Sequence, residues 1–263
     1  MTPRLIWRCV AMNVMMTIEY RGEFAMRMVN TLLGPLISLL VWLTVSEQGV
    51  RLPYDRDQFI TYYLLLSLVS MLTATWLGAY LAAAIRQGDL SPWLLRPVPY
   101  IVNDIGNNAG EKVIKLVLLC PMVGLVAVFL RASLPSDPRA WLLFTISLPL
   151  AAAVAFLLDF VIGSLAFWIQ DVWGLIRVKA LVGGFLAGQW VPLALFPARF
   201  QGLLQIQPFR YTLSFPLEVL TGHLTPAALA YGFAWQVGYC VGLWACYRLV
   251  WHYGLRAYAA TGA

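Results

Sequence analysis

Six runs of predominantly apolar residues follow one another along the chain, with short polar stretches between them. They cover residues 26–45, 59–85, 113–130, 141–169, 180–196 and 227–250. A helix needs about 20 mostly apolar residues to cross the hydrocarbon core of a membrane, and each run comes near or exceeds that length. We therefore predict an all-α, polytopic membrane protein of about six transmembrane helices, with residues 1–263 forming a single transmembrane domain.

The composition supports this prediction and narrows the function. The chain is 61% hydrophobic and 11% charged, and its mean hydropathy is +0.75. A soluble core could not absorb so much apolar surface. The net charge of +6 is dispersed among the loops, so we assign it to membrane topology and not to nucleic-acid binding.

The distribution of lysine and arginine predicts that both termini are cytoplasmic. Two thirds of the basic residues then lie on the inner side, as the positive-inside rule requires. The inner set is Arg4, Arg8, Arg21, Arg27, Arg86, Arg96, Lys112, Lys115, Arg177, Lys179, Arg248 and Arg256. The outer set is Arg51, Arg56, Arg131, Arg139, Arg199 and Arg210.

The chain lacks the side-chain patterns of the common catalytic sites. None of its three lysines lies in a GK[ST] sequence, so it has no Walker A loop, and its two histidines, His223 and His252, have no partner in the sequence. We expect no catalytic residue, metal site or cofactor in this chain. Asp159 is the one acidic residue deep within an apolar run, and it and Gln189 are the candidate pathway residues. The alternative for Asp159 is a structural pair with a neighbouring helix.

Three segments differ from simple loops. Residues 1–22 carry apolar side chains at helical spacing beside Arg4 and Arg8, which indicates an amphipathic helix on the membrane surface. Residues 86–100 predict a helix break at Gly88, a short helix, and a stop at Pro97. Residues 189–216 are too apolar for a free loop and too rich in proline for a span, so we predict a re-entrant element on the outer side.

The second and third of these segments resemble the permeases of type-2 ATP-binding-cassette exporters. The resemblance rests on Ile85-Arg86-Gln87-Gly88-Asp89-Leu90, Leu94-Leu95-Arg96-Pro97, Gly188-Gln189-Trp190-Val191-Pro192-Leu193-Ala194-Leu195-Phe196-Pro197 and Gln207-Pro208-Phe209. It implies a permease of a bacterial inner membrane, paired with a second permease of the same or a sister chain. It also implies cytoplasmic ATPase subunits, which would bind ATP and Mg.

The resemblance further implies that residues 86–97 form the cytoplasmic coupling segment that docks on the ATPase. The coupling residues would be Arg86, Gly88, Asp89, Leu90, Trp93, Leu94, Arg96 and Pro97. Trp93 and Leu94 would supply the apolar anchor and the charged residues its rim. The competing interpretation is an interfacial helix that rests on lipid.

Two other classes of protein compete with a permease. A proton-coupled secondary transporter would use a buried carboxylate such as Asp159, although such carriers more often show several buried charges. A membrane-embedded enzyme would use Asp159 and Asp171 together. On a single helix, however, these two carboxylates would lie about 18 Å apart, which is too far to act as a pair.

Overall fold

The computed structural model describes residues 21–258, apart from 50, 51, 98, 131, 133 and 223, together with residues 11 and 15. The predicted surface helix over residues 1–22 therefore lies almost entirely outside the described residues. Within them, every regular element is a helix, and the predicted all-α class is confirmed.

The described helices follow the order of the predicted apolar runs. They are α2 (Arg21–Glu47), α3 (Arg56–Thr73), α4 (Leu77–Gln87), α5 (Ser91–Leu94), α6 (Tyr100–Phe129), α7 (Pro138–Ser164), η1 (Leu165–Phe167), α8 (Trp173–Leu186), η2 (Leu193–Leu195), α9 (Ala198–Ile206), η3 (Pro208–Thr212), α10 (Ser214–Thr221) and α11 (Pro226–Ala257).

Three helical segments of the described chain are both long enough and apolar enough to cross a membrane. These are Arg56–Gln87, Tyr100–Phe129 and Pro138–Phe167, and a shorter apolar helix covers Leu33–Glu47 within α2. At 32 residues, α11 also has the length of a span, but Trp, Tyr and Arg side chains interrupt its apolar sequence. The chain is thus a polytopic membrane protein.

Two predicted spans differ from the observed helices. The second run is broken, because α3 ends at Thr73 and α4 begins only at Leu77. The bounds predicted for the fifth span, residues 180–196, are wrong. Its first residues belong to α8, which is 14 residues long and ends at Leu186, and the chain then turns at Gly188 in the left-handed conformation. Hydropathy missed both breaks because the residues around them are as apolar as the helices.

The helix starts carry conventional capping residues. At α3, the Asp55 carboxylate accepts the Gln58 N–H at 2.8 Å, while the Gln58 side chain accepts the Asp55 N–H, which makes a capping box. Asp137 caps α7 and Thr225 caps α11, and each is followed by a proline at the first helical position. These signals fix where the spans begin more sharply than hydropathy does.

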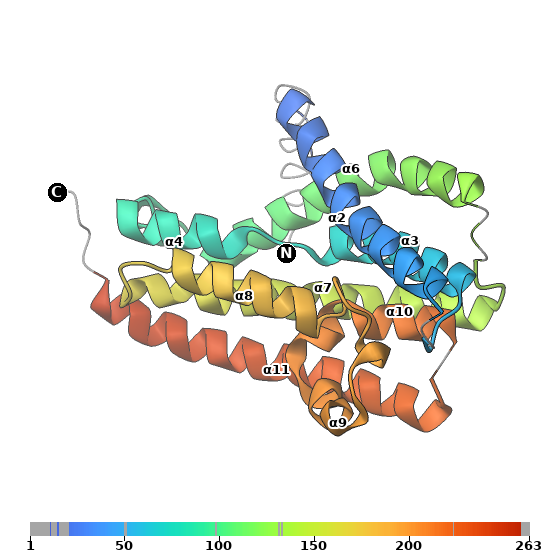
Figure 1. The fold of residues 1–263 in the computed structure, drawn as a ribbon. Helices are drawn as coiled ribbons and strands as arrows, with labels where there is room; N and C mark the ends of the chain where they lie inside the picture. Colours follow the sequence, from blue (N-terminus) through green and yellow to red (C-terminus); the bar gives the residue numbers. More distant parts are fainter. Residues whose placement is uncertain are drawn as a thin grey trace.

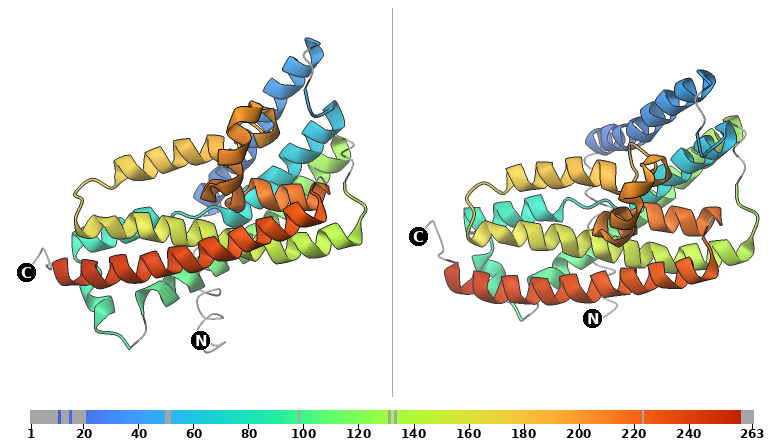
Figure 2. Two further views of the ribbon diagram at one scale, coloured as in Figure 1. Left: turned by 90° about the horizontal axis from the view of Figure 1, so that it is seen from below. Right: turned by 60° about the horizontal axis from the view of Figure 1, so that its bottom comes forward.

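Helix α7 occupies the centre of the bundle. It packs along α11 and α4, and it also contacts α3, α8 and α10 (Figure 1). The helices α4, α7 and α11 finish at one end of the bundle, where α8 begins. At the opposite end α3, α7 and α11 start (Figures 1 and 2). We call the first of these the C-terminal end. It carries Arg86 in the last turn of α4 and Arg256 in the last turn of α11, both assigned above to the inner side.

The helices at the edge of the bundle leave apolar surface uncovered. Helix α6 packs mainly on α3, and Val117, Leu125 and Phe129 are 66%, 73% and 83% exposed. Exposed apolar area of this extent marks a surface covered by lipid or by another protein. The protein core lies elsewhere, in one cluster around Tyr63 and Phe215 and another around Phe160.

Two glycines allow α4 and α7 to cross in contact. A Cβ atom at Gly163 would lie 2.6 Å from the Gly78 carbonyl oxygen, and one at Gly78 would lie 2.7 Å from the Asp159 carbonyl oxygen. Small residues permit such backbone approach between helices in membranes. The crossing therefore sets the position of α4 against α7.

We expect Gly163→Ala to destabilise the protein, because the added methyl group forces α4 away from α7. Overpacking of this kind costs about 1–3 kcal/mol, and the midpoint of thermal aggregation in detergent should fall. Gly124→Ala in α6 is the matched control, since nothing lies within 4 Å of its added Cβ. Equal midpoints for the two variants would contradict the tight crossing.

Candidate functional site

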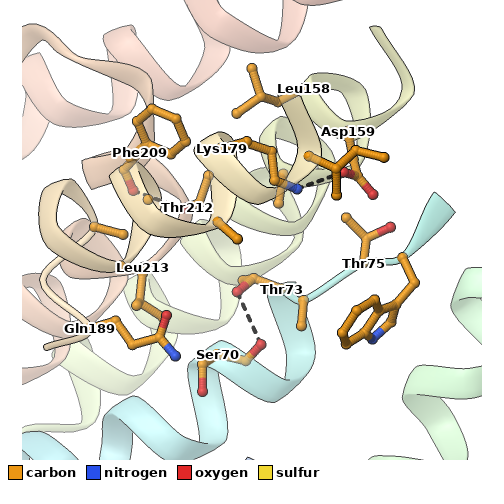
Figure 3. A pocket seen from close by; sticks show the side chains of 18 of the residues that line it. Ser70, Thr73, Thr75, Leu158, Asp159, Lys179, Gln189, Phe209, Thr212 and Leu213 are labelled. Atoms are coloured by element: carbon orange, nitrogen blue, oxygen red, sulfur yellow. Dashed lines mark hydrogen bonds and ion pairs between the residues drawn. The ribbon is translucent and has the colours of Figure 1, made fainter. Parts of the chain in front are cut away.

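A cavity of about 320 Å³ lies where α3 breaks into α4. The break comprises Ala74, Thr75 and Trp76, and α7, α8 and η3 supply the other walls (Figure 3). Asp159 and Gln189, which are 30 residues apart and were predicted separately as pathway residues, both line it. The tertiary structure thus brings the two candidate residues to one site.

Asp159 binds two donors at the edge of this cavity, the charged Lys179 and a backbone N–H. Its side chain is 2% exposed, and its Oδ1 accepts a hydrogen bond from Lys179 Nζ at 2.6 Å. Its Oδ2 accepts the Gly78 N–H at 2.9 Å, and this N–H belongs to the first turn of α4. A carboxylate is favourable there because the first N–H groups of a helix have no partner within the helix. The structure thus gives Asp159 the interhelical pair that was the alternative for it.

Lys179 is the functional candidate that the sequence analysis missed. With a fifth span starting at residue 180, Lys179 was counted among the cytoplasmic residues, but it lies inside α8 with its side chain 21% exposed. Asp159 precedes the end of α7 by five residues, and Lys179 follows the start of α8 by six. Both therefore lie about 8–9 Å from the same end of two consecutive helices. Had the helix ends been known, the equal distances of Asp159 and Lys179 from this end would have identified them as a pair.

The remaining polar side-chain groups of the cavity are hydroxyls, the Trp76 indole N–H and one amide. Thr73 Oγ1 donates to the Val69 carbonyl oxygen at 3.0 Å, and Thr212 Oγ1 donates to the Phe209 carbonyl oxygen at 2.7 Å. The Gln189 amide has no hydrogen-bond partner among the described residues (Figure 3). The walls between these groups are alanine, glycine, aliphatic and aromatic.

Helix α4 leads from this cavity to the predicted coupling segment. Gly88 ends the helix with φ 80°, in the left-handed conformation that favours glycine, and α5 follows at Ser91–Leu94. The predicted break and short helix are both present. Leu90, predicted as a coupling residue, is completely buried among side chains of α4 and α7, so it anchors the segment to the bundle and is not part of its exposed surface.

The exposed apolar surface of the segment differs from the predicted anchor. Trp93 is half-buried: its ring packs edge-on against Tyr100, and the Arg96 guanidinium lies 3.8 Å above its centroid. Leu94 is 42% exposed and Leu95 is 89% exposed. The exposed apolar pair of the segment is therefore Leu94 and Leu95, while Trp93 is partly covered by Tyr100 and Arg96. Arg86, Asp89 and Arg96, the charged residues predicted for the rim, are exposed, and so is Pro97.

Residues 189–216 form the predicted broken element, made of η2, α9, η3 and the start of α10. Its turn at Gly188 is held by the Tyr62 hydroxyl, which donates to the Gly188 carbonyl oxygen at 2.8 Å. The Arg210–Glu218 ion pair, at 2.6 Å, closes η3 onto α10. Because these contacts are internal, the element packs on the bundle as part of the fold.

The structure does not pair the two carboxylates of the catalytic alternative: Asp159 binds Lys179 and the Gly78 N–H at the cavity, which Asp171 does not line. Asp171 lies beyond the end of α7, is exposed, and accepts the N–H of Trp173, the first residue of α8, at 3.0 Å. It does not share a helix with Asp159, contrary to the assumption behind the 18 Å separation. In the part of the chain that the structure describes, no group of three or more His, Cys, Asp or Glu side chains could hold a metal ion.

Comparison with protein families assigns the chain to a family. Residues 32–262 match the model of the ABC-2 family transporter proteins. The chain belongs to this family. It is thus a membrane component of an ABC transporter, and the resemblance noted in the sequence is confirmed at the level of the family. Searches of curated proteins and of solved structures find no match.

We expect Lys179→Met to destabilise this ABC-2 family protein strongly, because it leaves Asp159 charged and buried. Removing one partner of a buried ion pair costs about 3–5 kcal/mol. The double variant Asp159→Asn, Lys179→Met should recover part of that loss, since the asparagine oxygen can still accept the Gly78 N–H. Thermal aggregation midpoints of the four forms measure the coupling. Arg177→Met, on the exposed side of α8, is the control, and additive losses would contradict a buried pair.

Proposed function

We propose that this chain is the permease subunit of an exporter, and that the cavity at the α3–α4 break is part of its substrate pathway. A separate cytoplasmic ATPase, which binds ATP and Mg, drives the transport. The observation that carries this proposal is the continuity of α4. One end of this helix borders the cavity and the other end enters the coupling segment.

Helix α4 is suited to carry a displacement. It is 11 residues, or about 16 Å, long. Leu90 fixes its C-terminal end to the docking segment, where the Leu90 N–H donates to the Ala84 carbonyl oxygen at 3.2 Å. Asp159 holds its N-terminal end. A force on Leu94 and Leu95 is thus delivered to the Asp159–Lys179 pair, and the non-helical residues 74–76 allow α4 to move relative to α3.

The coupling segment is also braced against the last helix. The Ser91 and Tyr258 hydroxyls share a hydrogen bond of 3.0 Å, and Tyr100, which packs on Trp93, stacks on Trp251 of α11. A segment tied at both ends transmits motion better than a loose loop. This bracing favours docking over a helix that simply rests on lipid.

We further propose that the protein functions in a bacterial inner membrane as a dimer with itself or a sister permease. The C-terminal end of the bundle faces the cytoplasm, and residues 189–216 are re-entrant on the outer side. The uncovered apolar surfaces of α2, α6 and α8 supply area for lipid and for the second permease. We infer that the direction of transport is export because the coupling and re-entrant segments resemble those of exporter permeases.

A proton-coupled carrier is the second candidate, and Asp104 supports it. This side chain of α6 is 5% exposed, and its Oδ2 has no hydrogen-bond partner among the described residues. Buried ionisable groups in spans are costly and usually have a function. Transport by reconstituted permease and ATPase that requires ATP and survives collapse of the proton gradient would exclude this candidate.

We expect the double variant Leu94→Ala, Leu95→Ala to weaken ATPase binding about tenfold or more, because each leucine loses apolar contact area at the interface. Co-purification in mild detergent and transport-coupled ATP hydrolysis measure the effect. Leu134→Ala is the matched control, since this leucine is 52% exposed just before α7 at the opposite end of the bundle. Parent-like binding and coupling in the double variant would leave the segment as a lipid-facing helix.

The proposed orientation predicts opposite labelling of two exposed leucines. In a chain whose own cysteines are replaced by serine, a membrane-impermeant maleimide should label Leu95→Cys only in inside-out vesicles. Leu134→Cys should react only in right-side-out vesicles. The reverse pattern would invert the topology and place the coupling segment outside the cell.

A further inference from the structure

The charges of the cavity at the α3–α4 break cancel. Among its lining residues Asp159 and Lys179 are the ionisable side chains, and they pair at 2.6 Å. A charged ligand group would lie beside the residue of the pair that carries the same charge and would be repelled by it. The residue of opposite charge would already be paired. In a weakly polar interior the repulsion and the missing counter-ion are not screened as they would be in water. The pair therefore disfavours both anionic and cationic ligand groups.

The polar groups of the cavity suit hydroxyls. One hydrogen bond from Lys179 Nζ goes to Asp159, which leaves two of its three N–H groups without a partner among the described residues. The Thr73 and Thr212 hydroxyls donate to backbone carbonyls, so they present oxygen lone pairs to the cavity. The Gln189 amide offers a donor and an acceptor. A ligand hydroxyl, which both donates and accepts, complements this set.

The rest of the wall is apolar. Trp76, which is 59% exposed, lines the cavity together with Leu158, Ile176 and Phe209. A fully polar solute would leave this area unsatisfied, whereas an alkyl chain would cover it. The cavity is bordered by two segments long enough to cross a membrane, Arg56–Gln87 and Pro138–Phe167, so such a chain would lie at the depth of lipid tails.

We propose that this cavity binds the uncharged, hydroxyl-bearing head of an amphiphile and that the Asp159–Lys179 pair excludes charged heads. The alkyl chain lies against Trp76 and Phe209, and the head meets Lys179 and Gln189. The inference rests on the proposed role of the cavity in transport, to which it adds the class of compound.

The test uses purified permease in phosphatidylcholine nanodiscs without an ATPase. A 1-lauroylglycerol probe with a diazirine in its chain is photolysed, and mass spectrometry maps the labelled peptides. We expect labelling in residues 70–79, 155–159 and 209–213. Excess 1-lauroylglycerol should abolish it, whereas dodecyl phosphate and dodecyltrimethylammonium, which have the same chain length, should not.

Variants of the cavity separate recognition from folding. Gln189→Leu should reduce labelling about fivefold, which is the effect of one hydrogen bond. Gln170→Leu makes the same change at an exposed position outside the cavity and should have no effect. Asp159→Asn leaves Lys179 without its counter-ion, so dodecyl phosphate should now compete with the probe.

Absent labelling, labelling outside the cavity, or equal displacement by the three heads would overturn the inference. So would parent-like labelling of Gln189→Leu, or an Asp159→Asn variant that still rejects dodecyl phosphate. Because the assay contains no ATPase, its result is independent of coupling. If the permease binds the probe selectively but captures no ATPase, the inference about the cavity's ligand stands and the proposed function is refuted.

Discussion

A carboxylate buried within a membrane bundle must be neutralised, and the way in which Asp159 meets this requirement organises the structure around it. One oxygen pairs with Lys179 and the other with the Gly78 N–H, so a single side chain of α7 fixes both α8 and the start of α4. The second contact needs a close approach of the backbones, which the glycines at positions 78 and 163 allow. Charge neutralisation and glycine packing therefore depend on each other at this crossing.

The same crossing accommodates the break in a long apolar segment. An uninterrupted helix over Arg56–Gln87 would satisfy its own N–H groups, whereas the break at residues 74–76 leaves N–H groups at the start of α4 in need of acceptors. Asp159 accepts one of them. The break also opens the cavity, and it separates α4 from α3. One interaction thus links the site proposed for the substrate to the short helix proposed to carry motion from the ATPase.

Much of this could be predicted without coordinates. The apolar runs identified the membrane class, Gly88 and Ser91-Pro92 identified the break and the short helix of the coupling segment, and the prolines after Gly188 identified the broken element before α11. Each of these signals is local: it depends on the conformational limits of glycine and proline or on the length of an apolar run. Asp159 stood out for a similar reason, since a charge in an apolar run is costly wherever its partner lies.

The chain's sequence by itself thus determined the class of the protein, most of its helices, and the residues whose burial needs an explanation. Only the tertiary structure decided what those residues contact. It placed Lys179 inside α8, turned Leu90 into the core, covered Trp93 with Arg96, and brought Gln189 to the same cavity as Asp159. The reason is physical. Hydropathy reports whether a residue leaves water, and among helices that are apolar on every side it does not report which neighbour the residue meets.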